Sequence, residues 1–110
     1  MTNSIDVENI VTNMLNKLIS GYAPQKVVLF GSHVYGQPHS DSDIDLLIIK
    51  DTSERFIDRW STVQGLLTGL HNSVPVETLV LTPDEVSSRL RKRDQFIAEI
   101  LHKGRTLYAA

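Results

Sequence analysis

Residues 27–49 read VVLFGSHVYGQPHSDSDIDLLII, and the rest of the fold is expected to follow from this stretch. Two short runs of β-branched and large apolar residues enclose a segment of Gly, Ser, Pro and Asp. This is the composition of two buried strands with a solvated loop between them. The stretch therefore predicts a strand, a glycine turn and a second strand.

Two aspartates stand at the start of the second strand. Side chains alternate between the faces of a strand, so Asp43 and Asp45 project to the same side about 7 Å apart. Two carboxylates at the start of an apolar strand lose hydration and repel each other, so they need water or a counter-cation. At this spacing the two carboxylates can share a pair of divalent cations.

The bulk composition limits the possible classes of protein. A chain of 110 residues, 41% hydrophobic and 22% charged, has the size of one compact domain, which we assign to residues 1–110. The formal net charge of -2 argues against sequence-independent binding of nucleic acid. The absence of cysteine excludes disulfides and thiolate metal sites. The sequence suggests neither a signal peptide nor a membrane span, so we expect a cytoplasmic protein.

Apolar spacing predicts the elements on either side of this stretch. A helical stripe runs from Val7 to Ile19 and ends at Gly21, and a second helix is expected from Phe56 to Leu70. A strand over 74–81 follows, with Pro75 near its beginning. Residues 82–85 (TPDE) form a capping box that opens one broken or two short helices; these include Phe96 in their apolar pattern and stop at Gly104. Residues 105–108 are a possible edge strand.

The order of the elements predicts their geometry. A helix joins strand 43–49 to strand 76–81, which is the usual connection between parallel neighbours. The loop after the first strand is too short for such a crossover, so the first two strands run antiparallel. The fold class is therefore α/β (α+β), with a small mixed sheet flanked by helices. In that arrangement five residues converge at one edge of the sheet: Gly31, Ser32, Asp43, Asp45 and Glu77.

The spacing of these residues resembles a known signature. Gly31-Ser32, Gly36 and the run Ser42-Asp43-Ile44-Asp45-Leu46 resemble the motif of nucleotidyltransferases of the DNA polymerase β superfamily. The short length, the leading helix, the TPDE helix start and the ending GRTLY are similar to the minimal nucleotidyltransferases of prokaryotes. The resemblance implies the nucleotidyltransferase fold. Proteins of this kind typically pair with a small helical HEPN-domain protein, often as its antitoxin, and some transfer AMP from ATP to a tyrosine of that partner.

The resemblance also implies roles for single residues. Gly31, Ser32 and Ser42 would bind the nucleotide, with ATP as substrate. Three carboxylates, those of Asp43, Asp45 and Glu77, would be the catalytic residues and would hold Mg²⁺, with two ions expected. Glu77 would ligate the ion that activates the attacking hydroxyl and could accept its proton. The implied function is Mg²⁺-dependent AMPylation of a protein hydroxyl by the antitoxin of a HEPN toxin–antitoxin pair.

Two positions depart from the family pattern and keep other interpretations open. Glu77 stands where relatives commonly have Asp, and His33 and Tyr35 occupy a segment that often carries Arg. The first alternative is therefore a weak or inactive nucleotide-binding protein that neutralises its partner by contact. The second is self-modification, or modification of a small molecule, in a homo-oligomer. The protein could thus form homo- or hetero-oligomers.

Plainer explanations exist for several of these residues. Asp43 and Asp45 could merely solubilise a turn, and Glu77 could be an exposed acid at a strand start. Gly31 and Gly36 have the spacing of a Walker A loop, but Gln37-Pro38 replaces the residues that would touch phosphate and metal. The basic run Arg89-Leu90-Arg91-Lys92-Arg93 is either a solvated helix end or a partner contact.

Overall fold

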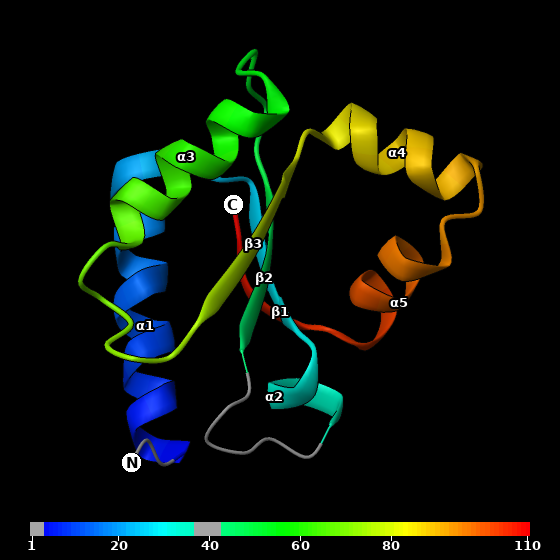
Figure 1. Ribbon diagram of the computed structural model, residues 1–110. Helices are drawn as coiled ribbons and strands as arrows, with labels where there is room; N and C mark the ends of the chain where they lie inside the picture. Colours follow the sequence, from blue (N-terminus) through cyan, green and yellow to red (C-terminus); the bar gives the residue numbers. More distant parts are fainter. Residues whose placement is uncertain (1–3, 37–42) are drawn as a thin grey trace.

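A four-stranded sheet forms the centre of the fold in this computed structural model, which describes residues 4–36 and 43–110 (Figure 1). The strands are β1 (Lys26–Phe30), β2 (Ile44–Ile49), β3 (Val76–Leu81) and β4 (Arg105–Ala109), and their order in the sheet is β3-β2-β1-β4. β1 pairs antiparallel with β2 and with β4, whereas β2 and β3 are parallel. The expected mixed sheet, with its antiparallel pair and parallel crossover strand, is confirmed.

Five helices in the described residues flank the sheet. They are α1 (Ser4–Tyr22), α2 (Ser32–Tyr35), α3 (Phe56–Leu67), α4 (Pro83–Arg91) and α5 (Gln95–Lys103). The region after β3 therefore forms two short helices. α3 ends three residues before the expected Leu70, because the chain turns back there and the Leu70 N–H donates to the Leu67 carbonyl over 3.0 Å. The single turn of α2 was expected to be loop, since one helical turn leaves no periodic pattern in the sequence.

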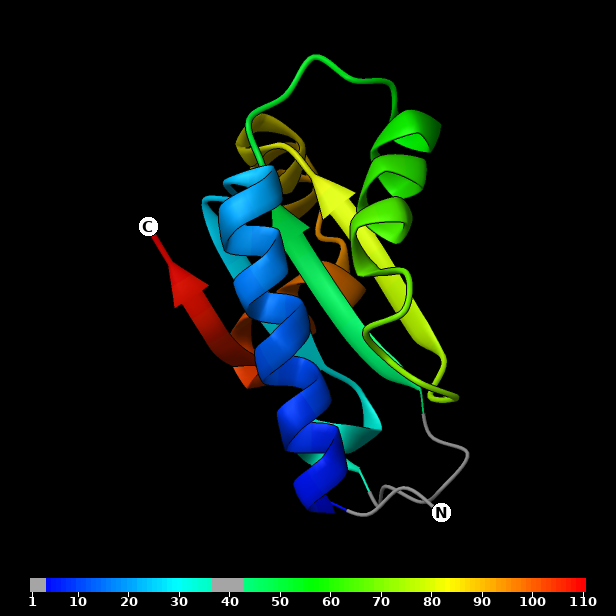
Figure 2. The same cartoon turned by 90° about the vertical axis from the view of Figure 1, so that its left-hand side faces the viewer.

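The helices cover both faces of the sheet. α1 and α3 lie together on one face, as Figure 2 shows, and α4 and α5 lie on the other. Alternate residues of β2 therefore enter two separate cores: Leu46 and Ile48 pack in the cluster that includes residues of α1 and α3, and Leu47 and Ile49 pack with residues of α4 and α5. Burial on both faces explains why the strand is apolar at every position after Asp45.

Parallel pairing sets Glu77 directly beside the acidic strand. Asp45 is the register partner of Glu77, and Leu47 is the partner of Leu79. β3 starts only at Val76, after Pro75, which has no N–H to donate to a ladder. The Pro75 carbonyl still accepts a hydrogen bond from the Ile44 N–H at 2.9 Å. This bond fixes the starts of β2 and β3 at the same edge of the sheet.

A buried arginine joins α3 to the start of α4. The side chain of Arg59 is 8% exposed, and its Nη1 lies 2.6 Å from Glu85 Oε1. Arg59 Nε also donates to the Glu54 carbonyl at 2.9 Å. Glu85 in turn closes the expected capping box with Thr82, and its pKa is lowered, chiefly by the Arg59 hydrogen bond. The ion pair thus links the first turn of α4 to α3 at the end of the sheet away from the aspartates.

Candidate functional site

The turn after β1 brings the backbone against an acidic side chain. Gly31 has a φ of 84°, a region that side-chain-bearing residues rarely adopt. A Cβ at this position would also overlap Asp45 Oδ2. The turn is closed by the N–H groups of Val34 and Tyr35, which donate to the Gly31 carbonyl at 3.0 and 3.1 Å. Glycine is therefore required here both for its conformation and for the close approach of Asp45.

The second glycine of the motif has a steric role. A Cβ at Gly36 would lie 2.8 Å from the Cα of Ser32, which is the first residue of α2. Because Gly36 has no side chain, the backbone at the end of α2 can pass close to Ser32. Ser32 itself is half-buried next to Gly31. Ser42, the third expected nucleotide-binding residue, lies outside the described residues.

Three carboxylates meet at the edge where β2 and β3 begin. Asp45 pairs with Phe30 of β1 on one side and with Glu77 of β3 on the other. Burial raises the pKa of Asp45, and the negative charges of Asp43 and Glu77 raise it further. His33 acts on this pKa in the opposite direction. The structure therefore brings Asp43, Asp45 and Glu77 within electrostatic reach of one another, beside the Gly31 turn.

The three carboxylates differ in exposure. Asp43 and Asp45 are half-buried, whereas Glu77 is exposed. Within residues 4–36 and 43–110, no three His, Asp or Glu side chains already form a group that could hold a metal ion. The donor chemistry nevertheless suits Mg²⁺, a hard cation that binds through one or two carboxylates and keeps its remaining positions for water and phosphate. Burial is the main cause of the raised pKa of Asp45, and a cation between these carboxylates would relieve the repulsion that adds to it.

Comparison with known families agrees with the motif. Residues 13–110 match the model of the family described as polymerase beta, nucleotidyltransferase. The chain belongs to this nucleotidyltransferase family. The resemblance of the Gly-Ser and Ser-Asp-Ile-Asp-Leu segments to minimal nucleotidyltransferases is thereby confirmed. A comparison with curated protein sequences gives no match.

Solved structures share the fold of this nucleotidyltransferase. A toxin–antitoxin complex with AMP-PNP contains a chain that is 25% identical, with a TM-score of 0.59 over 89% of this chain and 73% of that one. The MntA–HepT toxin–antitoxin structure gives 19% identity and a TM-score of 0.58, covering 94% and 73% of the two chains. A protein from Sulfolobus solfataricus assigned as a nucleotidyltransferase gives 21% identity and a TM-score of 0.55, covering 79% and 82%.

The charge at Asp45 leads to a first prediction, for the protein without metal. The pKa of Asp45 is higher in the folded protein than in the unfolded chain, where it is near 3.9. Asp45 therefore contributes stability that is fully present at pH values below its pKa in the unfolded chain. This stability is lost as the pH rises through its pKa in the folded protein. At pH 7 the ionised group therefore destabilises the fold. We expect Asp45→Asn to raise the melting temperature by a few degrees at pH 7, and by less as the pH falls toward 4.

Thermal melts without divalent cations at the two pH values test this expectation. Asp51→Asn, at an exposed position just after β2, is the matched control and should give a smaller change at pH 7. A lower melting temperature for Asp45→Asn at pH 7 would mean that contacts of the carboxylate outweigh its repulsion.

The site contains an aromatic pair that the sequence did not reveal. Phe30, the register partner of Asp45, meets Phe96 of α5 with ring centroids 5.8 Å apart and ring planes at 81°. Phe96 belongs to the apolar pattern of its helix, and residues of such a pattern usually face the core. Instead it is 54% exposed, while Ile97 and Ile100 supply the buried contacts of α5. A stripe of apolar residues predicts which face of a helix turns toward the sheet. It does not predict how far the sheet extends beneath that face.

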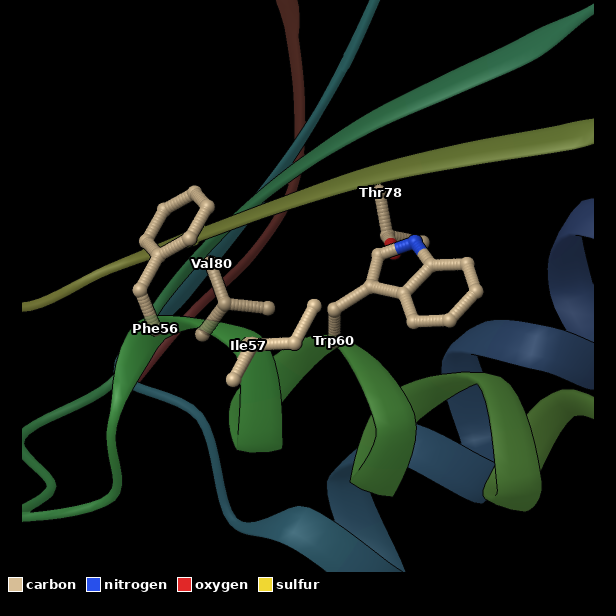
Figure 3. A pocket seen from close by; sticks show the side chains of 5 residues that line it. All are labelled: Phe56, Ile57, Trp60, Thr78 and Val80. Atoms are coloured by element: carbon tan, nitrogen blue, oxygen red, sulfur yellow. The ribbon is translucent and has the colours of Figure 1, made fainter.

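A groove on α3 is the other apolar surface of note. It has a volume of about 280 Å³, and it is lined by Phe56, Ile57, Trp60, Thr78 and Val80 (Figure 3). Phe56 and Trp60 belong to the apolar stripe expected for this helix and are about half exposed, whereas Val63 and Leu67 of the same stripe are fully buried. Val80 belongs to the core on the α1 and α3 face, so the groove lies on the side of the sheet opposite the carboxylates. The groove is therefore separate from the acidic site.

Proposed function

We propose that this nucleotidyltransferase transfers AMP from ATP to a hydroxyl group of a protein partner. The observation that carries the proposal is the approach of the Gly31 turn to Asp45, with Asp43 and Glu77 at the same sheet edge. A phosphate-binding turn beside clustered carboxylates provides both parts of a phosphoryl-transfer site, namely amides for phosphate and acids for a divalent cation.

Each residue has a distinct task in this proposal. The backbone amides around Gly31 and the Ser32 hydroxyl bind the terminal phosphates. Asp43, Asp45 and Glu77 would hold Mg²⁺, which neutralises phosphate charge and favours deprotonation of the attacking hydroxyl. The hydroxyl oxygen forms a bond to the α-phosphorus, the bond from this phosphorus to the bridging oxygen breaks, and pyrophosphate leaves. Glu77 takes the proton of the hydroxyl, directly or through water.

The proposed partner is a HEPN-domain toxin, with this chain as its antitoxin in the cytoplasm. Support comes from the shared fold with chains of toxin–antitoxin complexes, one of them determined with AMP-PNP. No helix in the described part of the chain is both long and apolar enough to cross a membrane. The acceptor would then be a side chain of the toxin, brought to the acidic edge of the sheet within the complex.

A second candidate function is neutralisation of the partner by contact, with a nucleotide bound but not transferred. The observation that favours it is the exposed side chain of Glu77, which does not complete a metal site with the two aspartates in the described residues. In that case Asp43 and Asp45 would serve nucleotide binding alone.

Nucleotide binding by the acidic edge can be tested by thermal melts. Ligand that binds only the folded state at about 100 times its Kd stabilises by about 2.7 kcal/mol, or roughly 10 °C in a domain of this size. We expect ATP with Mg²⁺ to give such a shift in the native protein and almost none in Asp43→Ala/Asp45→Ala. Asp51→Ala/Asp84→Ala removes the same charge at exposed positions elsewhere and should keep the full shift. Equal shifts in all three proteins would count against a carboxylate site for metal and nucleotide.

A further inference from the structure

Phe30 places an aromatic ring beside the acidic edge. It is the last residue of β1, directly before the Gly31 turn, and it is paired with Asp45 across the antiparallel ladder. Phe30 packs in the same core as Leu47, so its side chain and that of Asp45 project on the α4 and α5 face. Directly opposed residues in such a ladder have Cβ atoms about 5 Å apart. The Phe30 ring is therefore an immediate neighbour of the carboxylate.

Phe96 extends this aromatic surface away from the sheet. Its ring meets that of Phe30 in an edge-to-face contact, with centroids 5.8 Å apart. The start of α5 is fixed by Asp94, whose side chain accepts a hydrogen bond from the Ile97 N–H at 3.1 Å, and by the buried Ile97 and Ile100. Phe96 is thus held by one ring contact on a well-anchored helix and remains 54% exposed. A large exposed ring on a rigid support is suited to stacking.

The distance from Phe96 to the carboxylates fits a nucleoside. Phe30 lies opposite Asp45 in the ladder, and the Phe96 ring contacts the Phe30 ring. These two steps together place the Phe96 ring on the order of 10 Å from Asp45. In the proposed function the α-phosphate lies at the aspartates and the terminal phosphates lie at the turn after Phe30. The base, which is joined to the α-phosphate through the ribose, then lies one sugar away from the carboxylates. On the face that carries α5, Phe96 is an exposed ring at about that distance.

We propose that Phe96, supported edge-on by Phe30, is the platform on which the base of the nucleoside triphosphate stacks. This inference rests on the proposed function, because it takes the position of the α-phosphate from it. Stacking is tolerant of base identity, since every base has a flat π-face. Phe96 therefore supplies affinity for the nucleoside part of ATP, and the turn and carboxylates supply affinity for its triphosphate.

A pair of ligands separates these two contributions. The affinities of ATP and of inorganic tripolyphosphate, each with Mg²⁺, are measured by calorimetry for the native protein, Phe96→Ala, Phe96→Trp and Phe56→Ala. Loss of one stacked base is expected to weaken ATP binding about 10-fold in Phe96→Ala. Tripolyphosphate has no base, so its affinity should be unchanged. Phe96→Trp should bind ATP as tightly as the native protein or more tightly. Phe56→Ala, which removes an equally exposed ring from the α3 groove, should behave like the native protein.

The other outcomes overturn the inference in recognisable ways. If Phe96→Ala binds ATP as tightly as the native protein, the base lies elsewhere, and a raised KM for the protein acceptor would then assign Phe96 to that acceptor. If Phe96→Ala loses affinity for ATP and tripolyphosphate alike, the ring only supports the turn through Phe30. Failure of the native protein to bind either ligand would instead refute the proposed function itself.

Discussion

Asp43→Asn is expected to abolish the transfer of AMP to the partner while leaving the complex of the two proteins intact. The substitution removes one of the two half-buried carboxylates proposed to hold Mg²⁺ but keeps the size of the side chain. Charge stabilisation by such a cation contributes several kcal/mol to a phosphoryl-transfer transition state, so we expect a loss of at least about 10³-fold in rate. Intact-mass measurement of the partner after incubation with ATP and Mg²⁺ detects each added AMP unit.

The partner for this experiment is the HEPN-domain protein of the proposed toxin–antitoxin pair. Asp84→Asn, at an exposed position in the first turn of α4, is the matched control and should transfer AMP at the native rate. Size-exclusion chromatography shows whether the complex still forms. Complete neutralisation of the toxin by Asp43→Asn, without any gain in mass, would favour the contact mechanism instead.

The topology could be predicted because chain order and apolar patterning both constrain it. Residues 31–43 are too few for a crossover helix with its linkers, which favours an antiparallel partner for β1, and the helix between β2 and β3 allows the parallel pairing that is observed. The convergence of Asp43, Asp45 and Glu77 follows from the same two facts together with strand alternation. No spacing rule was needed to place Glu77 beside Asp45.

The features that escaped prediction depend on contacts between distant segments. Arg59 was not singled out, because its burial depends on Glu85, a residue 26 positions later, and on the carbonyl of Val80. The exposure of Phe56, Trp60 and Phe96 depends on where the sheet ends beneath each helix, which periodicity cannot reveal. The motif marks Gly31 as a turn, but the contact that requires glycine, with Asp45 Oδ2, is visible only in three dimensions.

Glu77→Gln is expected to separate binding from turnover. In the proposed site, nucleotide affinity rests on the Gly31 turn, Ser32, Asp43 and Asp45, so it should change little. The rate of transfer should fall by about 10²–10⁴-fold, the range for loss of a positioned general base, because a charge is removed where the attacking hydroxyl is deprotonated. The two quantities are measured by calorimetry with AMP-PNP and by the rate of AMP addition to the partner at saturating ATP.

Glu77→Asp is the sharper test of the same carboxylate, because it shortens the side chain by one methylene and keeps the charge. Asp45 and Glu77 are direct register partners, so the length of the side chain decides how far the charge reaches toward a shared cation. If β3 is placed as in relatives that carry Asp here, Glu77→Asp should retain or increase the rate. If the site depends on the longer arm of Glu77, the rate should fall while nucleotide binding persists. Undiminished turnover in Glu77→Gln would leave a site of two aspartates, and the exposed position of Glu77 at the start of β3 would then have no part in the chemistry.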